Sequence, residues 1–234
     1  MRKYTNRRAN HNLSNLAYQS LKAMITSGEI PHNRGMVERV ISDKLGMSRT
    51  PVRHALSRLQ QEGLVQIVPQ SGVFPIKIGY VEYQNILAVR EVLEGLAARL
   101  ATDHVSNAKL RELRAIFESI GDIPVLEKVS HKDYALANVR FHREILELSN
   151  NPKLIQTTEG LYDHLSLLKL RAIEITERRM KSMEEHQEVL QALEQRDADR
   201  AEQAMRAHIR SLKKDIEEKF NENPEIFEGG KEND

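Results

Sequence analysis

The sequence predicts a mainly α-helical protein with two domains: a small mixed domain first and an all-helical antiparallel bundle second. Apolar residues recur at helical spacing through most of the 234 residues. Two short β-like runs, LVQIV and VFPI, flank the turn sequence PQSG in the first third of the chain. The charge is also uneven, because residues 1–78 hold 12 Lys and Arg against 4 Asp and Glu, whereas the remainder holds 23 against 30.

The bulk composition narrows the class of protein further. No apolar run is long enough to span a membrane, and the basic start MRKYTNRRANHNL lacks the apolar core of a secretory signal. Cysteine is absent, which excludes disulfides and thiolate zinc sites, so we expect a cytoplasmic protein. A basic first part beside an acidic remainder predicts that only the first part meets a polyanion.

The first domain begins with two expected helices. Residues 1–12 are expected to form a flexible basic arm. An apolar stripe at helical spacing then predicts a helix that Gly28 would end; its members are Leu13, Leu16, Ala17, Leu21, Met24 and Ile25. A short second helix is expected over residues 37–45, broken at Gly46. Its predicted buried residues are Val40, Ile41 and Leu45.

The third expected helix starts after Ser48, a favourable N-cap residue, and carries Pro51 in its first turn. Its predicted buried face consists of Val52, Ala55, Leu56 and Leu59. The helix should end near Gly63, before the two β-like runs form a hairpin, or wing. Together these elements predict a winged helix-turn-helix over residues 13–78, and residues 76–81 would link it to the second domain.

The opposite side of the third helix is basic, with Arg49, Arg53 and Arg58. A recognition helix lies in the major groove, where an arginine can donate two hydrogen bonds to guanine O6 and N7. The hydroxyls of Ser48 and Thr50 and the helix N-terminus can meet phosphates. A solvated charged face is the alternative, but it leaves the one-sided basic character unexplained. The predicted DNA-contacting residues are Arg39, Ser48, Arg49, Thr50, Arg53, Ser71 and Gly72.

The second domain is expected to be helical throughout residues 82–220, followed by a polar tail over residues 221–234. Its helices are predicted over residues 82–104, 107–120, 125–149, 152–176, 179–195 and 197–220. Ser106, Asn151 and Asp197 are suitable N-cap residues, and Pro152 occupies a first helical position.

Four side chains of this domain suggest a metal site. Asn138 and His142 are four residues apart, so both project from one face of a helix, and His186 and His208 fall on two further helices. Three imidazoles and one oxygen can hold a divalent metal in a bundle core. Spacing alone also permits histidines without a metal, so a metal-free site stays open.

The stretch LGMSRTPVRHALSRLQQEGLVQIVPQSGVFP resembles the DNA-binding domain of GntR-family transcription regulators, over about residues 13–76. The family pattern is SRTPVREAL followed by a wing with a glycine. The resemblance implies DNA contacts by Arg39, Arg49, Thr50, Arg53 and Gly72. His54 stands where the family usually has glutamate, which removes a carboxylate from the recognition helix and puts the operator preference in doubt.

The stretches VREVLEGLAARLA, NVRFHREILELSNNP and EEHQEVLQALEQRDADRAEQAMRAHI resemble the all-helical FCD effector domain of the FadR subfamily, over nearly all of residues 82–215. In that family an aspartate and three histidines bind zinc, nickel or a similar metal, which commonly binds a carboxylate effector. The ligands implied here are Asn138, His142, His186 and His208. Asn138 replaces the aspartate, and because an amide oxygen is neutral the metal affinity should fall.

The same resemblance implies an effector pocket. Arg90 matches the arginine of the family segment R-x-x-L-E and could pair with the effector's carboxylate. An ion pair with Glu91 or Glu94 is the alternative for this arginine. His164 and Arg171 are further candidates for the pocket lining.

We therefore expect a ligand-responsive DNA-binding transcriptional regulator, a repressor rather than an enzyme. It would bind a pseudo-palindromic operator as a homodimer and respond to a small carboxylate metabolite. One alternative is a metal-free, effector-independent DNA-binding protein. Another is a metal-dependent enzyme fused to a DNA-binding domain, because such sites can activate water. Against it, the nearby acids Glu184 and Glu185 are expected on solvated helix faces.

Overall fold

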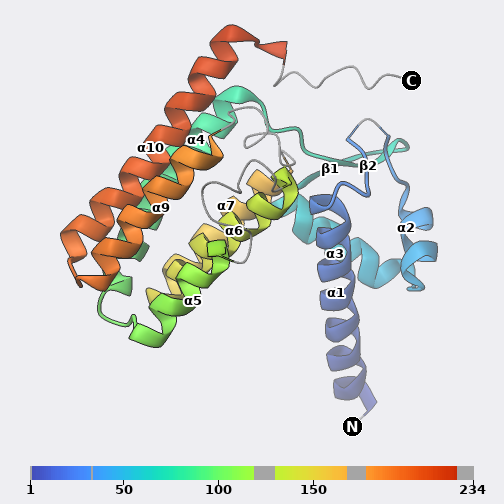
Figure 1. Ribbon diagram of the computed structural model, residues 1–234. Coiled ribbons are helices and arrows are strands. Elements are labelled where there is room, and N and C mark those ends of the chain that lie inside the picture. Colours follow the sequence, from blue (N-terminus) through green and yellow to red (C-terminus); the bar gives the residue numbers. More distant parts are fainter. Residues whose placement is uncertain (1, 33, 119–129, 168–177, 226–234) are drawn as a thin grey trace. The chain divides into compact units, whose positions relative to one another are not determined.

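The computed structural model describes residues 2–32, 34–118, 130–167 and 178–225 (Figure 1). The chain divides into two compact units, with the division between Ile78 and Gly79, and a short segment that begins at Tyr162 is grouped with the first unit. The described residues are mainly helical, with one small antiparallel sheet, as the sequence predicts.

The first unit is a winged helix-turn-helix. Its elements are α1 (Arg2–Thr26), α2 (Glu38–Leu45), α3 (Arg49–Gln61), β1 (Val65–Val68) and β2 (Gly72–Pro75). Helix α3 packs against α1, α2 and β1, so it holds the unit together (Figure 1). The four apolar residues predicted for the buried face of α3 are all at most 2% exposed, which confirms that prediction.

The wing depends on a glycine at its turn. Strands β1 and β2 pair antiparallel with Val68 opposite Gly72, and Met36 adds a bridge to Val73 on the other side of β2. Gly72 has φ +119, and a Cβ at this position would lie 3.1 Å from the backbone of Met36. The backbone conformation and the lack of space thus both require glycine here, whether or not DNA is bound.

Three expectations for the first unit differ from the structure. Helix α1 begins at Arg2, so residues 2–12 continue the helix instead of forming a separate arm; no glycine or proline interrupts the sequence from Arg2 to Thr26. Leu13 and Leu16 are 44% and 55% exposed, so the buried stripe of α1 starts at Ala17. Val40 is also exposed, because α2 turns the neighbouring Ile41 and Ser42 inward.

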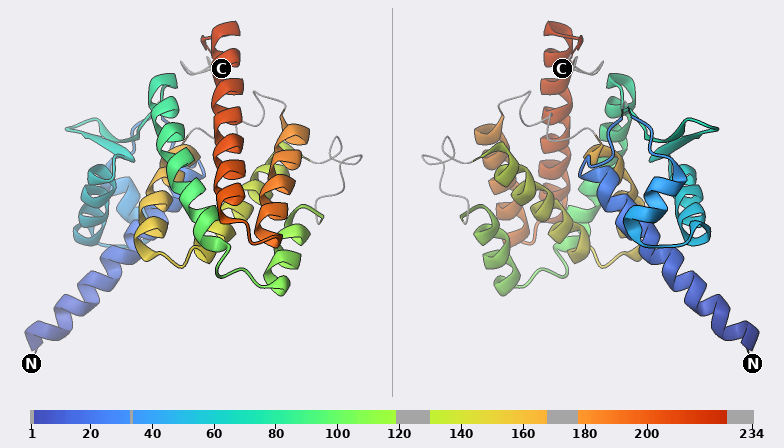
Figure 2. Two further views of the ribbon diagram at one scale, coloured as in Figure 1. Left: turned by 90° about the vertical axis from the view of Figure 1, so that its left-hand side faces the viewer. Right: turned by 90° about the vertical axis from the view of Figure 1, so that its right-hand side faces the viewer.

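The second unit is an all-helical bundle. Its elements are α4 (Tyr80–Ala101), α5 (Asn107–Glu118), α6 (His131–Leu148), the part of α7 (Pro152–Ser166) that precedes Tyr162, α9 (Arg179–Glu194) and α10 (Ala198–Glu222). Helix α10 packs against α4 and α9, while α6 packs against α4 and α5, so these five helices share a common core (Figure 2). The expected tail lies mostly outside the described residues, which end at residue 225.

Side-chain caps fix the starts of three bundle helices. The Asn151 side chain accepts hydrogen bonds from the backbone N–H groups of Lys153 and Leu154. Ser106 caps α5 through the N–H of Lys109, and Asp197 caps α10 through the N–H of Arg200. All three predicted caps are therefore confirmed, and each satisfies donors that a helix start leaves without partners.

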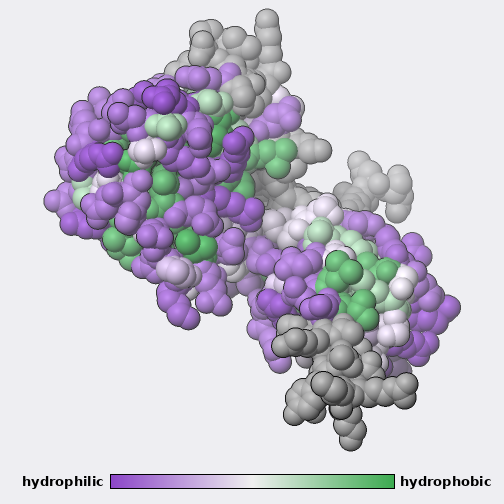
Figure 3. All heavy atoms as spheres, turned by 90° about the horizontal axis from the view of Figure 1, so that it is seen from below, coloured by the Kyte–Doolittle hydropathy of each residue, from purple (hydrophilic) through white to green (hydrophobic). Residues whose placement is uncertain are grey.

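The exposed face in Figure 3 is mostly hydrophilic, with hydrophobic residues gathered in small areas. Within the described residues, no helix combines the length and the apolar character that crossing a bilayer requires.

Candidate DNA-reading helix and candidate metal centre

The N-terminus of α3 is open to solvent. Ser48 is the N-cap residue in an extended conformation, and its hydroxyl makes no capping hydrogen bond among the described residues. Ser48, Arg49 and Thr50 are all exposed. The first N–H groups of a helix have no partner within the helix and attract anions. This helix start therefore has the donors that a phosphate group needs.

The three arginines of α3 have different surroundings. Arg58 lies over the ring of Tyr18, 3.6 Å from its centroid, and pairs with Glu62 at 3.0 Å, so it stabilises the domain itself. Arg53 donates from Nε and Nη2 to the two carboxylate oxygens of Glu38. Arg49 has no ion-pair partner among the described side chains. Only Arg49 and Arg53 therefore remain as arginines of α3 that can read bases.

The other predicted DNA-contacting residues lie on α2 and the wing. Arg39 follows Glu38 on α2, is exposed, and lies 3.6 Å from Asp43 one turn on. Ser71 is exposed in the turn of the wing, beside Gly72. All of these positions belong to the first unit, which contains the basic part of the chain.

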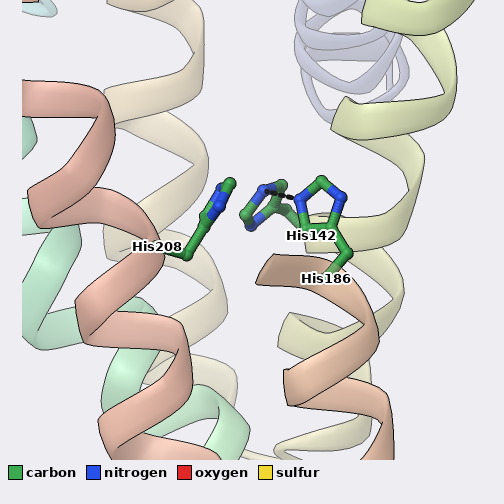
Figure 4. A group of neighbouring side chains, drawn as sticks. All are labelled: His142, His186 and His208. Carbon is green, nitrogen blue, oxygen red and sulfur yellow. Dashed lines mark hydrogen bonds between the residues drawn. The ribbon is translucent and has the colours of Figure 1, made fainter. Parts of the chain in front are cut away.

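In the second unit, three helices bring three histidines together. His142 on α6, His186 on α9 and His208 on α10 point toward one another (Figure 4). Each is at most 2% exposed, and one ligating nitrogen from each lies within 4.8 Å of the others. Nε2 of His142 and Nε2 of His186 are 3.3 Å apart. Two nitrogens bound tetrahedrally to one zinc ion lie about 3.4 Å apart, so this pair has the spacing that such an ion needs.

Two carboxylates orient two of these rings from outside. Nδ1 of His142 lies 2.6 Å from Glu94, and Nδ1 of His208 lies 2.8 Å from Glu185. A carboxylate behind a histidine fixes its ring and its tautomer, which leaves the other nitrogen for a metal. Nδ1 of His186 is buried with no hydrogen-bond partner among the described residues, and the His186 ring stacks on Phe117.

Each carboxylate is itself held by a buried arginine. Arg90 pairs with Glu94 one turn along α4, which is the ion-pair alternative for this arginine. Arg178 lies 2.6 Å from Glu185 and also donates to Asp215 and Ser211. The contacts therefore form two similar series. One runs from His142 through Glu94 to Arg90, and the other runs from His208 through Glu185 to Arg178.

Sequence reasoning missed most of these supporting groups. The sequence predicts Glu94 only as a partner of Arg90 and gives no sign of Arg178, because no spacing rule joins residues of different helices. The expectation that Glu185 is solvated is wrong, since it is half-buried and bound on two sides. Glu184 is exposed as expected. The signal that could have pointed to Glu94 is its i, i+4 spacing from Arg90 on an otherwise apolar helix face.

Burial favours the neutral form of His186 and His208. It lowers the pKa of His186 well below its ordinary value, and nearby His208 and His142 lower it further. Burial also lowers the pKa of His208 to about 4, although Glu185 acts in the opposite direction. Burial raises the pKa of Glu94, but Arg90 and His142 outweigh it, and the net pKa is lowered. Neutral imidazole is the form that binds metal ions.

Two of the remaining predicted site residues lie on α6 and α7. Asn138 is half-buried on α6, one turn before His142. His164 is half-buried on α7 and is not a member of the group of three histidines. Arg171 lies outside the described residues.

Comparison with known proteins gives both units a family. Residues 13–74 match the family described as bacterial regulatory proteins, gntR family, and residues 85–211 match the FCD domain. The second match spans more than half of the chain, and His142, His186 and His208 fall within it.

Individual proteins are similar over nearly the whole length. An uncharacterized HTH-type transcriptional regulator in an unstable DNA locus of Streptomyces ambofaciens is 28% identical over 90% of this chain and 87% of its own. The HTH-type transcriptional repressor RspR of Escherichia coli is 23% identical over 90% of this chain and 91% of its own. The solved structure of E. coli McbR/YncC has the same fold, with a TM-score of 0.73 and 23% identity. The match covers 89% of this chain and 99% of that chain. The chain therefore belongs to the GntR family of bacterial regulatory proteins, carries an FCD domain, and is a DNA-binding transcriptional regulator.

Proposed function

We propose that this regulator is a cytoplasmic repressor that binds a pseudo-palindromic operator as a homodimer and responds to a small carboxylate metabolite. A two-fold dimer would present two α3 helices to two half-sites of the operator. The name of the similar protein RspR supports the choice of repressor. Arg49 and Arg53 would contact bases, while Arg39, Ser48, Thr50, Ser71 and Gly72 would meet the backbone.

The buried group of His142, His186 and His208 is the observation that carries the effector proposal. These residues would hold a divalent ion such as zinc or nickel, with Asn138 as a neutral fourth ligand. When bound, such an ion supplies a positive charge and open positions that an anionic oxygen can occupy. The supporting Glu94 and Glu185 keep two of the rings oriented for that role.

We do not propose catalysis at this group. A metal-dependent hydrolase needs a general base near the open position. Glu94 and Glu185 instead face the outer Nδ1 atoms of His142 and His208, and each is paired with an arginine. Their geometry suits orientation of ligands better than proton transfer at a substrate.

The proposal can be tested with duplexes selected from a random-sequence pool by the full-length protein. Affinity for the best duplex would be measured with and without a panel of small mono-, di- and tricarboxylates, and the stoichiometry by light scattering. We expect two chains per duplex, and a weaker affinity with at least one class of carboxylate. If no carboxylate changes the affinity, the effector-independent alternative replaces this proposal. A single chain per duplex would refute the dimer.

A further inference from the structure

The recognition helix carries an arginine whose orientation is set by a carboxylate on another helix. Glu38 lies in the first turn of α2, and Arg53 lies in the second turn of α3. Nε of Arg53 donates to Oε2 of Glu38 at 3.1 Å, and Nη2 donates to Oε1 at 3.0 Å. The contact is thus bidentate and runs along one side of the planar guanidinium group.

This arrangement leaves the other edge of the guanidinium unoccupied by Glu38. A guanidinium group has five N–H donors, and Glu38 takes one from Nε and one from Nη2. Both donors of Nη1 and the second donor of Nη2 remain, and one N–H of each Nη atom points outward to form the end-on edge of the fork. Guanine is recognised by two parallel donors of this kind, directed at O6 and N7. Arg53 is 71% exposed, so this edge is accessible.

An acidic residue here is otherwise unfavourable, because it weakens the attraction between a basic surface and phosphates. The first 78 residues hold only four acids, and each is paired with a base within the domain: Glu29 with Lys44, Glu38 with Arg53, Asp43 with Arg39, and Glu62 with Arg58. Of these, only Glu38 forms a bidentate contact, and it does so with an arginine on the exposed side of α3.

We propose that Glu38 is a specificity-determining positioning residue, which holds Arg53 with its end-on edge directed at a guanine. The inference rests on the proposed function, in which Arg53 contacts bases. A side chain fixed before binding loses less conformational entropy when the complex forms, and it can adopt fewer alternative contacts with the wrong base. Glu38 therefore increases discrimination between bases, and its negative charge reduces sequence-independent affinity.

Asp43→Asn is a matched control for Glu38→Gln. Both substitutions remove one negative charge from α2 and replace a carboxylate by an amide of nearly the same shape, but Asp43 pairs with Arg39 at the looser distance of 3.6 Å. A further variant, Arg53→Lys, keeps the positive charge and loses the planar fork, so it identifies the positions that Arg53 reads. Glu38→Asp keeps the charge and withdraws the carboxylate by one methylene.

The full-length variants would each select duplexes from a random pool, and affinities would be measured for the preferred duplex and its single-base variants. Glu38→Gln and Asp43→Asn should raise affinity for unrelated duplexes equally. At the positions where Arg53→Lys loses its guanine preference, Glu38→Gln should lower that preference by about threefold to tenfold, whereas Asp43→Asn should leave it unchanged. Glu38→Asp should also lower the guanine preference. Because this variant keeps the negative charge, the loss would show that the position of the carboxylate matters and not its charge alone.

The possible failures are distinguishable. If Arg53→Lys keeps every base preference of the wild type, Arg53 does not read bases and that part of the proposed function fails. If Arg53→Lys changes the preference but Glu38→Gln behaves like Asp43→Asn, the positioning role of Glu38 is wrong. A stronger guanine preference in Glu38→Gln would also overturn it, because Glu38 would then withhold Arg53 from DNA.

Discussion

The Glu38–Arg53 pair of the first unit and the Glu94–Arg90 pair of the bundle use the same two side chains in opposite surroundings. In the first pair the side chains are 29% and 71% exposed; in the second they are 2% and 7% exposed. Water screens the exposed charges, so that pair contributes little to the stability of the fold. Charges in the buried pair depend on each other, because removing one leaves the other desolvated.

This difference suits the two roles. A residue that reads DNA must keep the edge that meets a base open to solvent, and an exposed ion pair leaves that edge of Arg53 open. A residue that orients a metal ligand must stay in place, and a buried pair enforces that. We therefore expect substitutions in the first unit to change recognition more than stability, and substitutions around the histidines to change both.

The largest effect is expected for Glu94→Gln. The substitution leaves Arg90 buried without its carboxylate and removes the group that faces Nδ1 of His142. Breaking a buried pair costs about 3–5 kcal/mol, and loss of an outer carboxylate lowers metal affinity about 10- to 100-fold. Denaturant unfolding and a competition assay with a zinc chelator would measure the two effects. A stability within about 1 kcal/mol of the wild type would show that the pair is less dependent on burial than we argue.

A pH dependence of similar size is expected for the metal-free protein. The pKa of His208 falls from 6.5 in a model compound to about 4 in the folded chain. Between these values the unfolded state binds a proton that the folded state does not, so stability falls as the pH falls from about 6.5 to about 4. The loss from His208 should be about 3 kcal/mol, and His186 acts in the same direction. Urea unfolding of chelator-treated protein would measure it; a stability that stays constant over this range would contradict neutral buried histidines.

Arg49→Ala should have an intermediate effect, limited to recognition. Arg49 is exposed at the start of α3, so its removal should leave the unfolding free energy nearly unchanged. If it pairs with a guanine, base discrimination should fall by about 1–3 kcal/mol at the position that it reads. Fluorescence anisotropy with the selected duplex and its single-base variants would report this. Unchanged affinity and base preference would remove Arg49 from the DNA-reading group.

Glu38→Gln should change the stability only slightly. The pair that it breaks is exposed, and such pairs contribute about 0–1 kcal/mol. The same denaturant measurement used for Glu94→Gln gives a direct comparison of the two glutamates. Equal losses for both substitutions would contradict the contrast between the exposed and the buried pair.

The sequence predicts exposed and local features better than buried networks. The order of the helices, the wing, the apolar face of α3 and three helix caps follow from periodicity and from residue preferences within a few positions. The histidines could be proposed as metal ligands because two of the four suggested ligands share a helix face, and because the second domain resembles the FCD effector domain. The roles of Glu185 and Arg178 could not, since they depend on how α9 and α10 pack. Arg58 shows the reverse problem: its pattern on α3 matches that of a DNA-reading arginine, but Tyr18 and Glu62 of the same domain surround it.

The central claim is that the buried histidines hold a metal ion in a DNA-binding regulator. Metal content by elemental mass spectrometry tests it most directly, on wild type and His186→Ala purified without chelators or nickel columns. We predict about one equivalent of a divalent metal per wild-type chain and nearly none in the variant, with Asn138 tolerated as a neutral ligand. No metal in either protein, including after incubation with zinc or nickel, would contradict the claim, and an effector would then have to be bound by polar side chains without a metal ion.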